Sequence, residues 1–516
     1  DSFLEERWLF EAITETYIPL IKFFDRLLQE NVFFRISISL SPSLLAMLED
    51  ELLQSRYEAH LVKMIKLCER EMERTRPEPH LNFLANMYHR LFNEAHDIFT
   101  NRCHRRIALA FKQLHQRGCV ELLTTTATHA LLPLFASQPK SLSAQITTGL
   151  DYFESIFDFR PQGIWLPECG YFPGLDTRLQ REGIRYFIIE SHGIEHADTK
   201  PYYSVYAPLY TPDGIAAFGR DRASLKQVWS AREGFPGDPA YREFYRDIGH
   251  DLDYGYISPY CTDGVRSDTG IKYYRITGKS GWKEPYCPDA ARERAAQHAG
   301  TFVRQRIDHI NHLASSMETP PVIIAPFDAE LFGHWWFEGP QWLNFVMRKS
   351  AFDQDCFALT TPDEYLRRHP VHQSGYPSTS TWGHKGYNEA WLNHKTDWIY
   401  PELHECAQRL GQLAEKHGRS RRIAKTTRRA LNQCLRELLL AQSSDWPFII
   451  NSDTSSQYAE RRIKDHVARF HCLADGIQQR SINTEHLAAL EQMDAIFPDA
   501  DFLNFCDPAP AAISKT

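Results

Sequence analysis

The chain has 516 residues, 43% of them hydrophobic, and its 58 basic and 66 acidic side chains give a formal charge of -8. Single cores stop growing near ~250–300 residues, so this length predicts one large domain with one or two smaller ones. The mild negative charge excludes the basic surface that nucleic acid or an anionic membrane requires, and it favours a neutral substrate.

The 11 cysteines are odd in number, scattered and never arranged as C-x-x-C. This usage indicates neither a disulfide framework nor a zinc ribbon, so we expect a reducing, cytoplasmic setting. No apolar run approaches the ~18–20 residues that span a bilayer, and no basic and then apolar leader opens the sequence. We therefore expect a soluble chain that is not secreted.

The first part of the chain is predicted to be mostly helical. Apolar residues recur at helical spacing over residues 8–30, and residues 33–40 then alternate as a strand does. From residue 43 to residue 117 the pattern is again helical, with a break near Pro77 and Pro79. This stretch is too long for one crossover helix, so we predict an inserted helical subdomain.

Strand signals return after this insertion. Short apolar runs alternate with helical stretches, the pattern of parallel strands in a sheet or barrel. The runs lie at residues 119–124, 163–166, 186–189, 322–327 and 357–359. We predict a (β/α) barrel over residues 1–42 and 118–380, with long site loops between residues 192 and 288. An all-helical C-terminal domain is predicted over residues 381–516.

Two carboxylates, Glu168 and Asp328, each follow directly after an apolar run. Barrel enzymes place their catalytic groups at the C-terminal ends of parallel strands. Either residue alone could equally well cap the next helix. The pair, in aromatic surroundings, favours catalysis. Cleavage of a glycosidic bond needs one group that attacks or activates water and another that protonates the leaving oxygen.

Long motifs carry a resemblance to a known family. They are WLPECGY around Glu168, FDAELFGHWWFEGP around Asp328, VELLTTTATHALLPL from residue 120, LKQVWSAREGFPGDPAYREFYRD from residue 225 and QSSDWPF from residue 442. Through them nearly the whole chain resembles glycoside hydrolase family 57, and within it the α-1,4-glucan branching enzymes. The resemblance implies an α/β fold, a (β/α)7 barrel with a helical insertion and an all-helical C-terminal domain. It also implies that Glu168 is the nucleophile and Asp328 the general acid/base.

The resemblance further implies a set of substrate-binding residues. They are the groove aromatics Trp8, Trp229, Trp335, Trp382 and Trp391, the subsite histidines His129 and His192, and two groups from the C-terminal domain, Gln442 and Asp445. Each has a structural alternative. The tryptophans could fill a core or an interface, the histidines could be core or capping residues, and the aspartate could be a turn residue. We place Trp382 and Trp391 on the acceptor side, where an aromatic wall would exclude water.

Two features depart from the family's pattern or leave a choice open. The H-x-H-x-P strand that the family carries near its N-terminus does not occur before the Trp8 helix, so it is either trimmed here or missing from the barrel. Tyr202, Tyr203 and Tyr206 match the tyrosine at the tip of the family's active-site loop equally well.

The expected function is α-1,4-glucan branching by a retaining double displacement, in glycogen or α-glucan synthesis. The alternatives are a 4-α-glucanotransferase, an α-amylase-type hydrolase and a catalytically impaired glucan-binding protein. We expect amylose, amylopectin or glycogen as substrate, no metal, no cofactor, no nucleic acid or membrane partner, and a monomer. The carboxyl groups of Glu168 and Asp328 are expected about 5–5.5 Å apart, the spacing of retaining enzymes.

Overall fold

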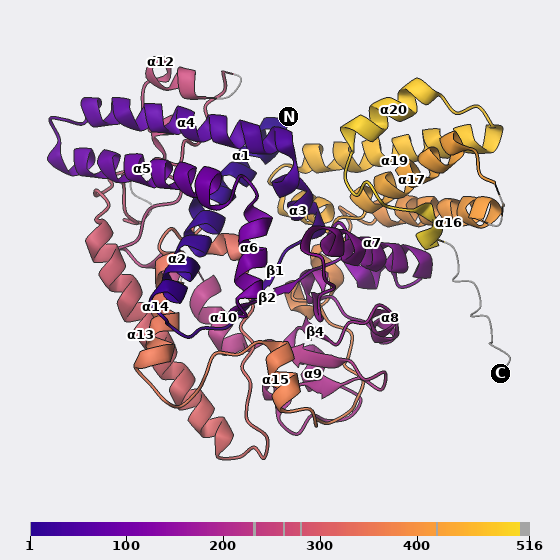
Figure 1. The fold of residues 1–516 in the computed structure, drawn as a ribbon, viewed down its shortest axis with the longest axis horizontal. Helices are drawn as coiled ribbons and strands as arrows, with labels where there is room; N and C mark the ends of the chain where they lie inside the picture. The colour runs from indigo at the N-terminus through magenta and orange to yellow at the C-terminus, as the bar shows by residue number, and fades with distance from the viewer. Residues whose placement is uncertain are drawn as a thin grey trace. The chain divides into compact units, whose positions relative to one another are not determined.

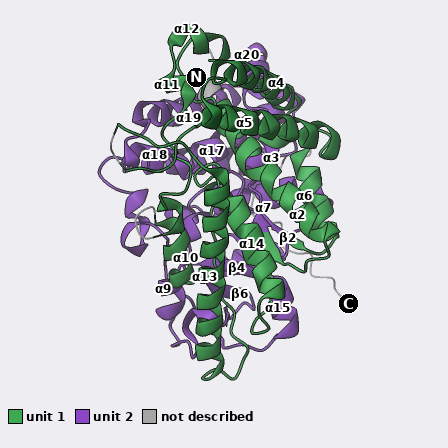
Figure 2. Ribbon diagram, turned by 90° about the vertical axis from the view of Figure 1, so that its left-hand side faces the viewer, with its two compact units in different colours: residues 1–37, 47–121, 221–361 green, residues 38–46, 122–220, 362–516 purple. Residues whose placement is uncertain are grey.

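The computed structural model describes residues 2–230, 234–261, 264–278, 281–418, 420 and 422–505. Helices make up most of the chain (Figure 1). The chain forms two compact units, drawn in separate colours in Figure 2. Unit 1 comprises residues 1–37, 47–121 and 221–361, and unit 2 comprises residues 38–46, 122–220 and 362–516. Each unit is therefore assembled from three separate stretches of sequence.

Unit 1 opens with a helix that one wider turn interrupts. The helix predicted over residues 8–30 is observed as α1 (Ser2–Ala12), the π-helical turn η1 (Ile13–Tyr17) and α2 (Ile18–Gln29). All five side chains of η1 are buried. Single π-helical turns within α-helices are rare and frequently lie at functional sites.

The helical stretch predicted over residues 43–117 is also observed. It consists of α3 (Pro42–Glu49), α4 (Glu51–Arg74), α5 (Pro79–Asp97), η2 (Ile98–Arg102) and α6 (Ile107–Gln116). Asp50 caps α4 by accepting a hydrogen bond of 2.8 Å from the backbone N–H of Leu53. Pro79 stands at the start of α5, where its missing N–H costs no helical hydrogen bond.

The remaining helices of unit 1 lie after residue 221. Two long ones, α13 (Pro288–Ala314) and α14 (Gly339–Phe352), pack along each other. The others are short: α10 (Arg222–Trp229), η6 (Phe235–Gly237), α11 (Ile248–Asp251), α12 (Tyr254–Ile257), η7 (Ser258–Tyr260) and η8 (Ala329–Leu331).

Unit 2 contains a four-stranded sheet in the order β3-β4-β6-β5. The strands β3 (Gly163–Trp165), β4 (Tyr186–Ile189) and β6 (Ala216–Gly219) are parallel, and β5 (Leu209–Tyr210) is antiparallel to β6. Helix α8 (Leu175–Arg181) lies between β3 and β4 in the chain, so the two strands can run in the same direction. Every residue of β4 and β6 is buried, as their unbroken apolar sequences require.

A second sheet pairs β1 (Ile36–Ser39) with β2 (Val120–Leu123), and Thr124 extends β2 by a parallel bridge to Ile164. The strands predicted at residues 119–124, 163–166 and 186–189 are therefore confirmed to within two residues at either end. These sheets are small, and they do not confirm a seven-stranded barrel.

The strands predicted at residues 322–327 and 357–359 are wrong. Within the first run, Ile324 forms an isolated bridge and its carbonyl accepts from the N–H of Asp221 at 2.7 Å, but residues 322–327 do not form a strand. Three prolines within and before this run, at positions 320, 321 and 326, remove the N–H groups that a ladder needs. In the second run the backbone N–H of Phe357 is taken by the side chain of Gln354 at 2.9 Å.

The core of unit 2 lies around its sheet, where α7 (Pro139–Phe157) contributes several buried side chains. Short elements complete this part: η3 (Leu132–Phe135), η4 (Pro167–Cys169), α9 (Ser191–Glu195), η5 (Ser204–Tyr206), α15 (Pro362–Arg368), η9 (His384–Gly386) and η10 (Asn388–Ala390).

The C-terminal part of unit 2 is helical, as predicted. It contains α16 (Ile399–Gly418), α17 (Lys425–Ala441), α18 (Asp445–Ser452), α19 (Ser456–Gln479), α20 (Thr484–Met493) and η11 (Phe502–Phe505). Apolar residues of α16, α17, α19 and α20 form one buried cluster. Within the described chain, no helix is long and apolar enough to cross a membrane.

Candidate active site

Glu168 stands in the short turn η4, just beyond the end of the parallel strand β3. Its backbone and that of Cys169 are left-handed, with φ of 58° and 52°. For residues other than glycine this conformation costs about 1–2 kcal/mol each, and it is frequent at functional sites. The N–H of Trp382 donates to the carbonyl of Glu168 at 2.9 Å, which holds the strained turn from a distant part of the chain.

Both carboxylate oxygens of Glu168 accept a hydrogen bond from a side chain. The indole N–H of Trp382 lies 2.6 Å from Oε2, and the hydroxyl of Ser444 lies 2.7 Å from Oε1. Glu168 is only 9% exposed, so little water competes for these hydrogen bonds. Hydrogen bonds to an ionised acceptor are about twice as strong as neutral ones. The carboxylate is therefore fixed in one orientation.

His129 stands next to the same carboxylate. Its Nδ1 lies 3.1 Å from Ser444 Oγ and 3.7 Å from Glu168 Oε1. The backbone of His129 is also left-handed, with φ of 57°, and its carbonyl accepts from the N–H of Ser444 at 3.1 Å. The structure thus brings three of the predicted site residues, His129, Glu168 and Trp382, into one cluster.

His192 supports the segment that carries Trp382. Its Nε2 lies 2.9 Å from the carbonyl of Gly386, so this nitrogen carries the proton and donates. Gly386 has φ of +84°, and a Cβ there would meet the His192 ring at 2.6 Å, so only glycine fits. The ring of Tyr387 packs against His192 with centroids 5.6 Å apart. His192 therefore positions the loop that carries Trp382.

Arg220 and Glu190 complete this cluster, and sequence reasoning missed both. The Arg220 guanidinium lies 5.2 Å from the centre of the Trp382 ring and pairs with Glu190. Glu190 also accepts a hydrogen bond of 2.7 Å from Ser191. Each residue directly follows a parallel strand of the sheet, and Glu168 lies three residues after the end of β3, so position at this edge of the sheet is the signal that could have found them.

Gln442 and Asp445 form their hydrogen bonds with residues other than Glu168. Gln442 is buried, its carbonyl accepting from Gln145 at 2.9 Å and its amide donating to Ser141. Asp445 accepts from Ser443 at 3.2 Å. Between these two predicted residues lies Ser444, whose hydroxyl contacts Glu168.

Trp391 has the surroundings of a core residue, which favours the packing alternative over a substrate wall. It is 1% exposed and packs against Gly383, where a Cβ would lie 2.5 Å from its ring. We expect Trp391→Ala to lower the free energy of unfolding by about 3–5 kcal/mol, because it leaves a large cavity. Trp382→Ala should cost clearly less, because Trp382 is only half-buried. Urea denaturation of both variants would measure this, and equal losses would contradict it.

Asp328 lies in unit 1 and is exposed at the start of η8. Its side chain makes no capping hydrogen bond to that turn, so the capping alternative gains no support. Seven residues later, Trp335 is 55% exposed and stacks on Phe244 with ring centroids 4.5 Å apart. Trp8 and Trp229, also in unit 1, are exposed as well. Exposed indole faces suit sugar rings.

The loop after Asp328 is held by the π-helical turn η1. Tyr17 donates to Glu330 at 2.6 Å, and the N–H of His334 donates to Thr16 at 3.3 Å. Gly333 has φ of +124°, and a Cβ there would lie 1.7 Å from the carbonyl of Glu15, so this approach requires glycine. The π-helical turn η1 therefore anchors the loop at Glu330, Gly333 and His334.

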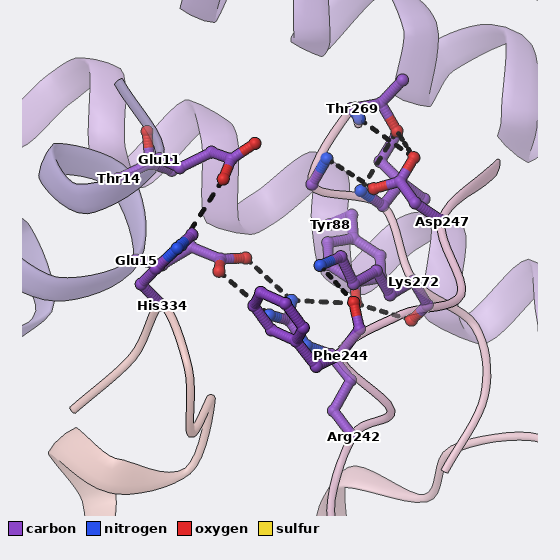
Figure 3. Close-up of polar contacts among 12 residues, drawn as sticks. Glu11, Thr14, Glu15, Tyr88, Arg242, Phe244, Asp247, Thr269, Lys272 and His334 are labelled. Atoms are coloured by element: carbon purple, nitrogen blue, oxygen red, sulfur yellow. Dashed lines mark hydrogen bonds and ion pairs between the residues drawn. The ribbon is translucent and has the colours of Figure 1, made fainter. Parts of the chain in front are cut away.

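A buried ionic network lies next to His334 of this loop (Figure 3). Arg242 forms two hydrogen bonds with Glu15, of 2.8 and 2.9 Å, and both side chains are buried. Lys272 donates to the carbonyl of Phe244 at 2.6 Å and lies 4.4 Å above its ring. The base of the Phe244–Trp335 stack is therefore fixed by a charged side chain.

Glu11 is the pH-sensitive member of this network. Burial and the neighbouring Glu15 raise its pKa to about 8, while Lys272 and Arg7 act in the opposite direction. His334 Nδ1 lies 3.4 Å from Glu11, and burial lowers the pKa of that histidine. In the unfolded chain Glu11 loses its proton near pH 4.5, whereas in the folded chain it keeps the proton up to about pH 8. The free energy of unfolding therefore falls as pH rises from 4.5 to about 8.

We expect Glu11→Gln to become more stable relative to the natural chain as pH rises from 6 to 9. The amide cannot ionise, so the difference should grow by about 1–3 kcal/mol. Urea denaturation at both pH values measures it. Glu69→Gln, at an exposed glutamate of the same unit, is the control and should show no trend. A difference that stays constant with pH would contradict the prediction.

One group in the described chain has the composition of a metal site, although the sequence predicts none. Glu437, His466 and Asp494 are all buried with ligand atoms within 4.8 Å of one another. The Arg469 guanidinium lies 2.8 Å from Asp494 and 4.0 Å from Glu437, so a cation already neutralises these carboxylates. We interpret the group as an ionic link between α17, α19 and the end of α20.

Comparison with known proteins gives the family. Residues 1–376 match the description "Glycosyl hydrolase family 57", and residues 402–505 match "1,4-alpha-glucan branching enzyme, C-terminal". The chain belongs to glycosyl hydrolase family 57. The sequence resemblance on the Glu168 and Asp328 motifs is thereby confirmed.

Three family 57 or related proteins illustrate the similarity. A 1,4-alpha-glucan branching enzyme from Thermococcus kodakarensis is 32% identical over 91% of this chain and 70% of its own length. The crystal structure of the α-amylase AmyC from Thermotoga maritima has a TM-score of 0.92 at 43% identity, covering 99% of this chain and 96% of that one. A family 57 branching enzyme from Pyrococcus horikoshii has a TM-score of 0.87 at 31% identity, covering 98% and 93%.

Proposed function

We propose that this family 57 chain is an α-1,4-glucan branching enzyme that acts by a retaining double displacement. The observation that carries the proposal is the carboxylate of Glu168, which stands beyond a buried parallel strand with both oxygens held by side chains. A nucleophile fixed in this way needs no reorganisation before it attacks. The similarity to the T. kodakarensis branching enzyme and the match of residues 402–505 support the choice of reaction.

In the proposed mechanism Glu168 attacks the anomeric carbon of an α-1,4 linkage while Asp328 protonates the departing oxygen. A covalent glycosyl-enzyme results, with the cleaved chain as leaving group. Asp328 then removes the proton from the 6-hydroxyl of an acceptor chain, which attacks the same carbon and releases Glu168. This mechanism requires the two carboxyl groups to stand about 5–5.5 Å apart during the reaction.

The substrate groove is proposed to use exposed aromatic side chains. Trp8, Trp229 and Trp335 offer indole faces to a neutral glucan, and Trp382 would lie beside the reacting sugar because it contacts Glu168. His129 is proposed as a subsite residue next to that sugar. Tyr202 is the best candidate for the loop tip, because it is 80% exposed whereas Tyr206 packs on the core.

Finer features of the chain also remain proposals. The parallel strands β3, β4 and β6 would belong to the (β/α)7 barrel of the family, with residues 43–117 as its insertion and residues 381–516 as the C-terminal domain. The cysteines of the described chain form no disulfide, which supports a reducing, cytoplasmic compartment. We also propose that the enzyme is a monomer and that it acts in glycogen or α-glucan synthesis.

Hydrolysis is the second candidate function. The 43% identity and high TM-score with the α-amylase AmyC favour it, and the same two carboxylates would serve it. The two functions differ only in whether water or a sugar hydroxyl attacks the glycosyl-enzyme.

Incubation with amylose separates the candidates. For a branching enzyme, proton NMR detects new α-1,6 anomeric signals and a reducing-end assay detects few new ends. For an amylase, reducing ends accumulate and the α-1,6 signal stays at its starting level. An absence of both products would refute both functions and leave a glucan-binding protein.

A further inference from the structure

Ser444 occupies a position that the backbone fixes independently of its side chain. It lies between α17 and α18, is 2% exposed, and donates its N–H to the carbonyl of His129 at 3.1 Å. Its neighbour Ser443 forms an antiparallel bridge with Ala130. The hydroxyl of Ser444 is therefore carried to Glu168 by a rigid junction between two distant segments.

The usual role of a serine at this place in a helix does not explain the contact. Ser444 is the N-cap residue of α18, yet its hydroxyl makes no capping hydrogen bond. An N-cap serine whose hydroxyl bonds the backbone of the helix stabilises that helix, and this stabilisation is absent here. The hydroxyl bonds Glu168 Oε1 instead, at 2.7 Å.

His129 orients the hydroxyl. Its Nδ1 lies 3.1 Å from Ser444 Oγ, so a proton on Nδ1 is donated to the serine oxygen and the serine proton is left to point at Glu168. Trp382 differs from Ser444 in this respect, because an indole N–H can only donate, whereas a hydroxyl both donates and accepts. Of the two donors, Ser444 alone can adjust as the charge on Glu168 changes.

We propose that Ser444 is a catalytic residue of the second half of the reaction, in which its hydroxyl stabilises Glu168 as the leaving carboxylate. The inference rests on the proposed role of Glu168 as nucleophile. In the first step the C1–O bond of the glucan breaks, a C1–O bond to Glu168 forms, and Asp328 gives its proton to the departing oxygen.

In the second step an acceptor hydroxyl attacks C1 and its proton passes to Asp328. The ester bond to Glu168 breaks, and its electron pair returns to the carboxylate. Negative charge thus grows on Glu168 in this step, where a donor 2.7 Å from Oε1 lowers the barrier. In the first step the same donor stabilises the attacking carboxylate, so it does not speed that step. Loss of the hydroxyl should therefore slow release of the sugar more than its capture.

The test compares Ser444→Ala with the natural chain, using α-maltotriosyl fluoride as donor and amylose chains as acceptor. Rapid quenching and mass spectrometry of the intact chain measure the fraction present as covalent glycosyl-enzyme. We expect this fraction to rise and turnover to fall about 10-fold or more, while the initial rate of fluoride release changes by less than about 3-fold, because one hydrogen bond to a charged group is lost.

Ser443→Ala is the matched control, since its hydroxyl bonds Asp445 and not Glu168. It should behave as the natural chain does. Ser444→Cys keeps the volume but offers only a weak S–H donor, so it should also accumulate the glycosyl-enzyme and provides the test if the alanine variant fails to fold.

The outcomes separate the two proposals. If the natural chain forms the glycosyl-enzyme and the Ser444 variants do not accumulate it, or slow both steps equally, the inference about Ser444 is overturned and the nucleophile stands. If the natural chain turns over donor and acceptor without any covalent species, the proposed mechanism fails and the inference fails with it.

Discussion

Replacing Glu168 by alanine is expected to lower turnover of amylose by on the order of 10⁴–10⁶-fold, because it removes the group proposed to attack the anomeric carbon. The main contacts of this residue are hydrogen bonds from Ser444 and Trp382 rather than apolar packing. The variant should therefore fold. The measurement is a reducing-end and α-1,6 assay on amylose, with circular dichroism to verify the fold.

Glu168→Gln is the sharper companion variant. Its amide oxygen can still accept from Trp382, and its NH₂ group can donate to the hydroxyl of Ser444. It preserves the local hydrogen bonds while removing the nucleophile, so it should melt close to the natural chain and remain as inactive as the alanine variant. Activity within 10-fold of the natural chain in either variant would mean that Glu168 is not the nucleophile.

Asp328→Ala should lower turnover of amylose by about 10²–10⁴-fold, the usual contribution of a positioned general acid. The loss should be much smaller for capture of sugar from α-maltotriosyl fluoride, because fluoride departs without a proton. Asp328 is exposed and does not cap η8, so the variant should still fold, which circular dichroism verifies.

Glu330→Gln is the control for this variant. Glu330 lies two residues further along the same loop and accepts from Tyr17, so its loss perturbs the loop without removing a proposed proton donor. It should retain activity on both donors in the same ratio as the natural chain. An Asp328→Ala variant that is equally impaired on amylose and on the fluoride would contradict the assignment of Asp328 as general acid.

Local sequence patterns predicted those helices and strands whose own residues determine their conformation. The runs that became β3 and β4 are apolar and free of proline, and both were found. Residues 322–327 are equally apolar, but the prolines at positions 320, 321 and 326 lack the N–H groups that a strand ladder needs. A count of apolar residues does not reveal this difference. The π-helical turn η1 could not be predicted, because it depends on partners more than 200 residues away, such as Arg242 on Glu15.

The site was predictable in its segments and less so in its side chains. Motif resemblance selected His129, Glu168 and Trp382, and the structure brings these three together. It also selected Gln442 and Trp391, whose side chains are buried among other residues. In each of these segments the deciding quantity is the direction in which a side chain points. That direction is set by backbone pairings such as Ser443 with Ala130, and these cannot be read from one sequence.

The contact between Ser444 and Glu168 means that the C-terminal region takes part in positioning the proposed nucleophile. A donor to one carboxylate oxygen comes from the junction before α18, and the donor to the other comes from Trp382, both downstream of residue 380. A chain truncated after residue 376, where the match to the hydrolase family ends, would keep the nucleophile but lose both hydrogen-bond donors that orient its carboxylate. The C-terminal helices are thus not an accessory module that evolution or an engineer could exchange to alter product structure alone. A graft between family members would have to carry the serine junction and the tryptophan loop together with the strand that bears Glu168.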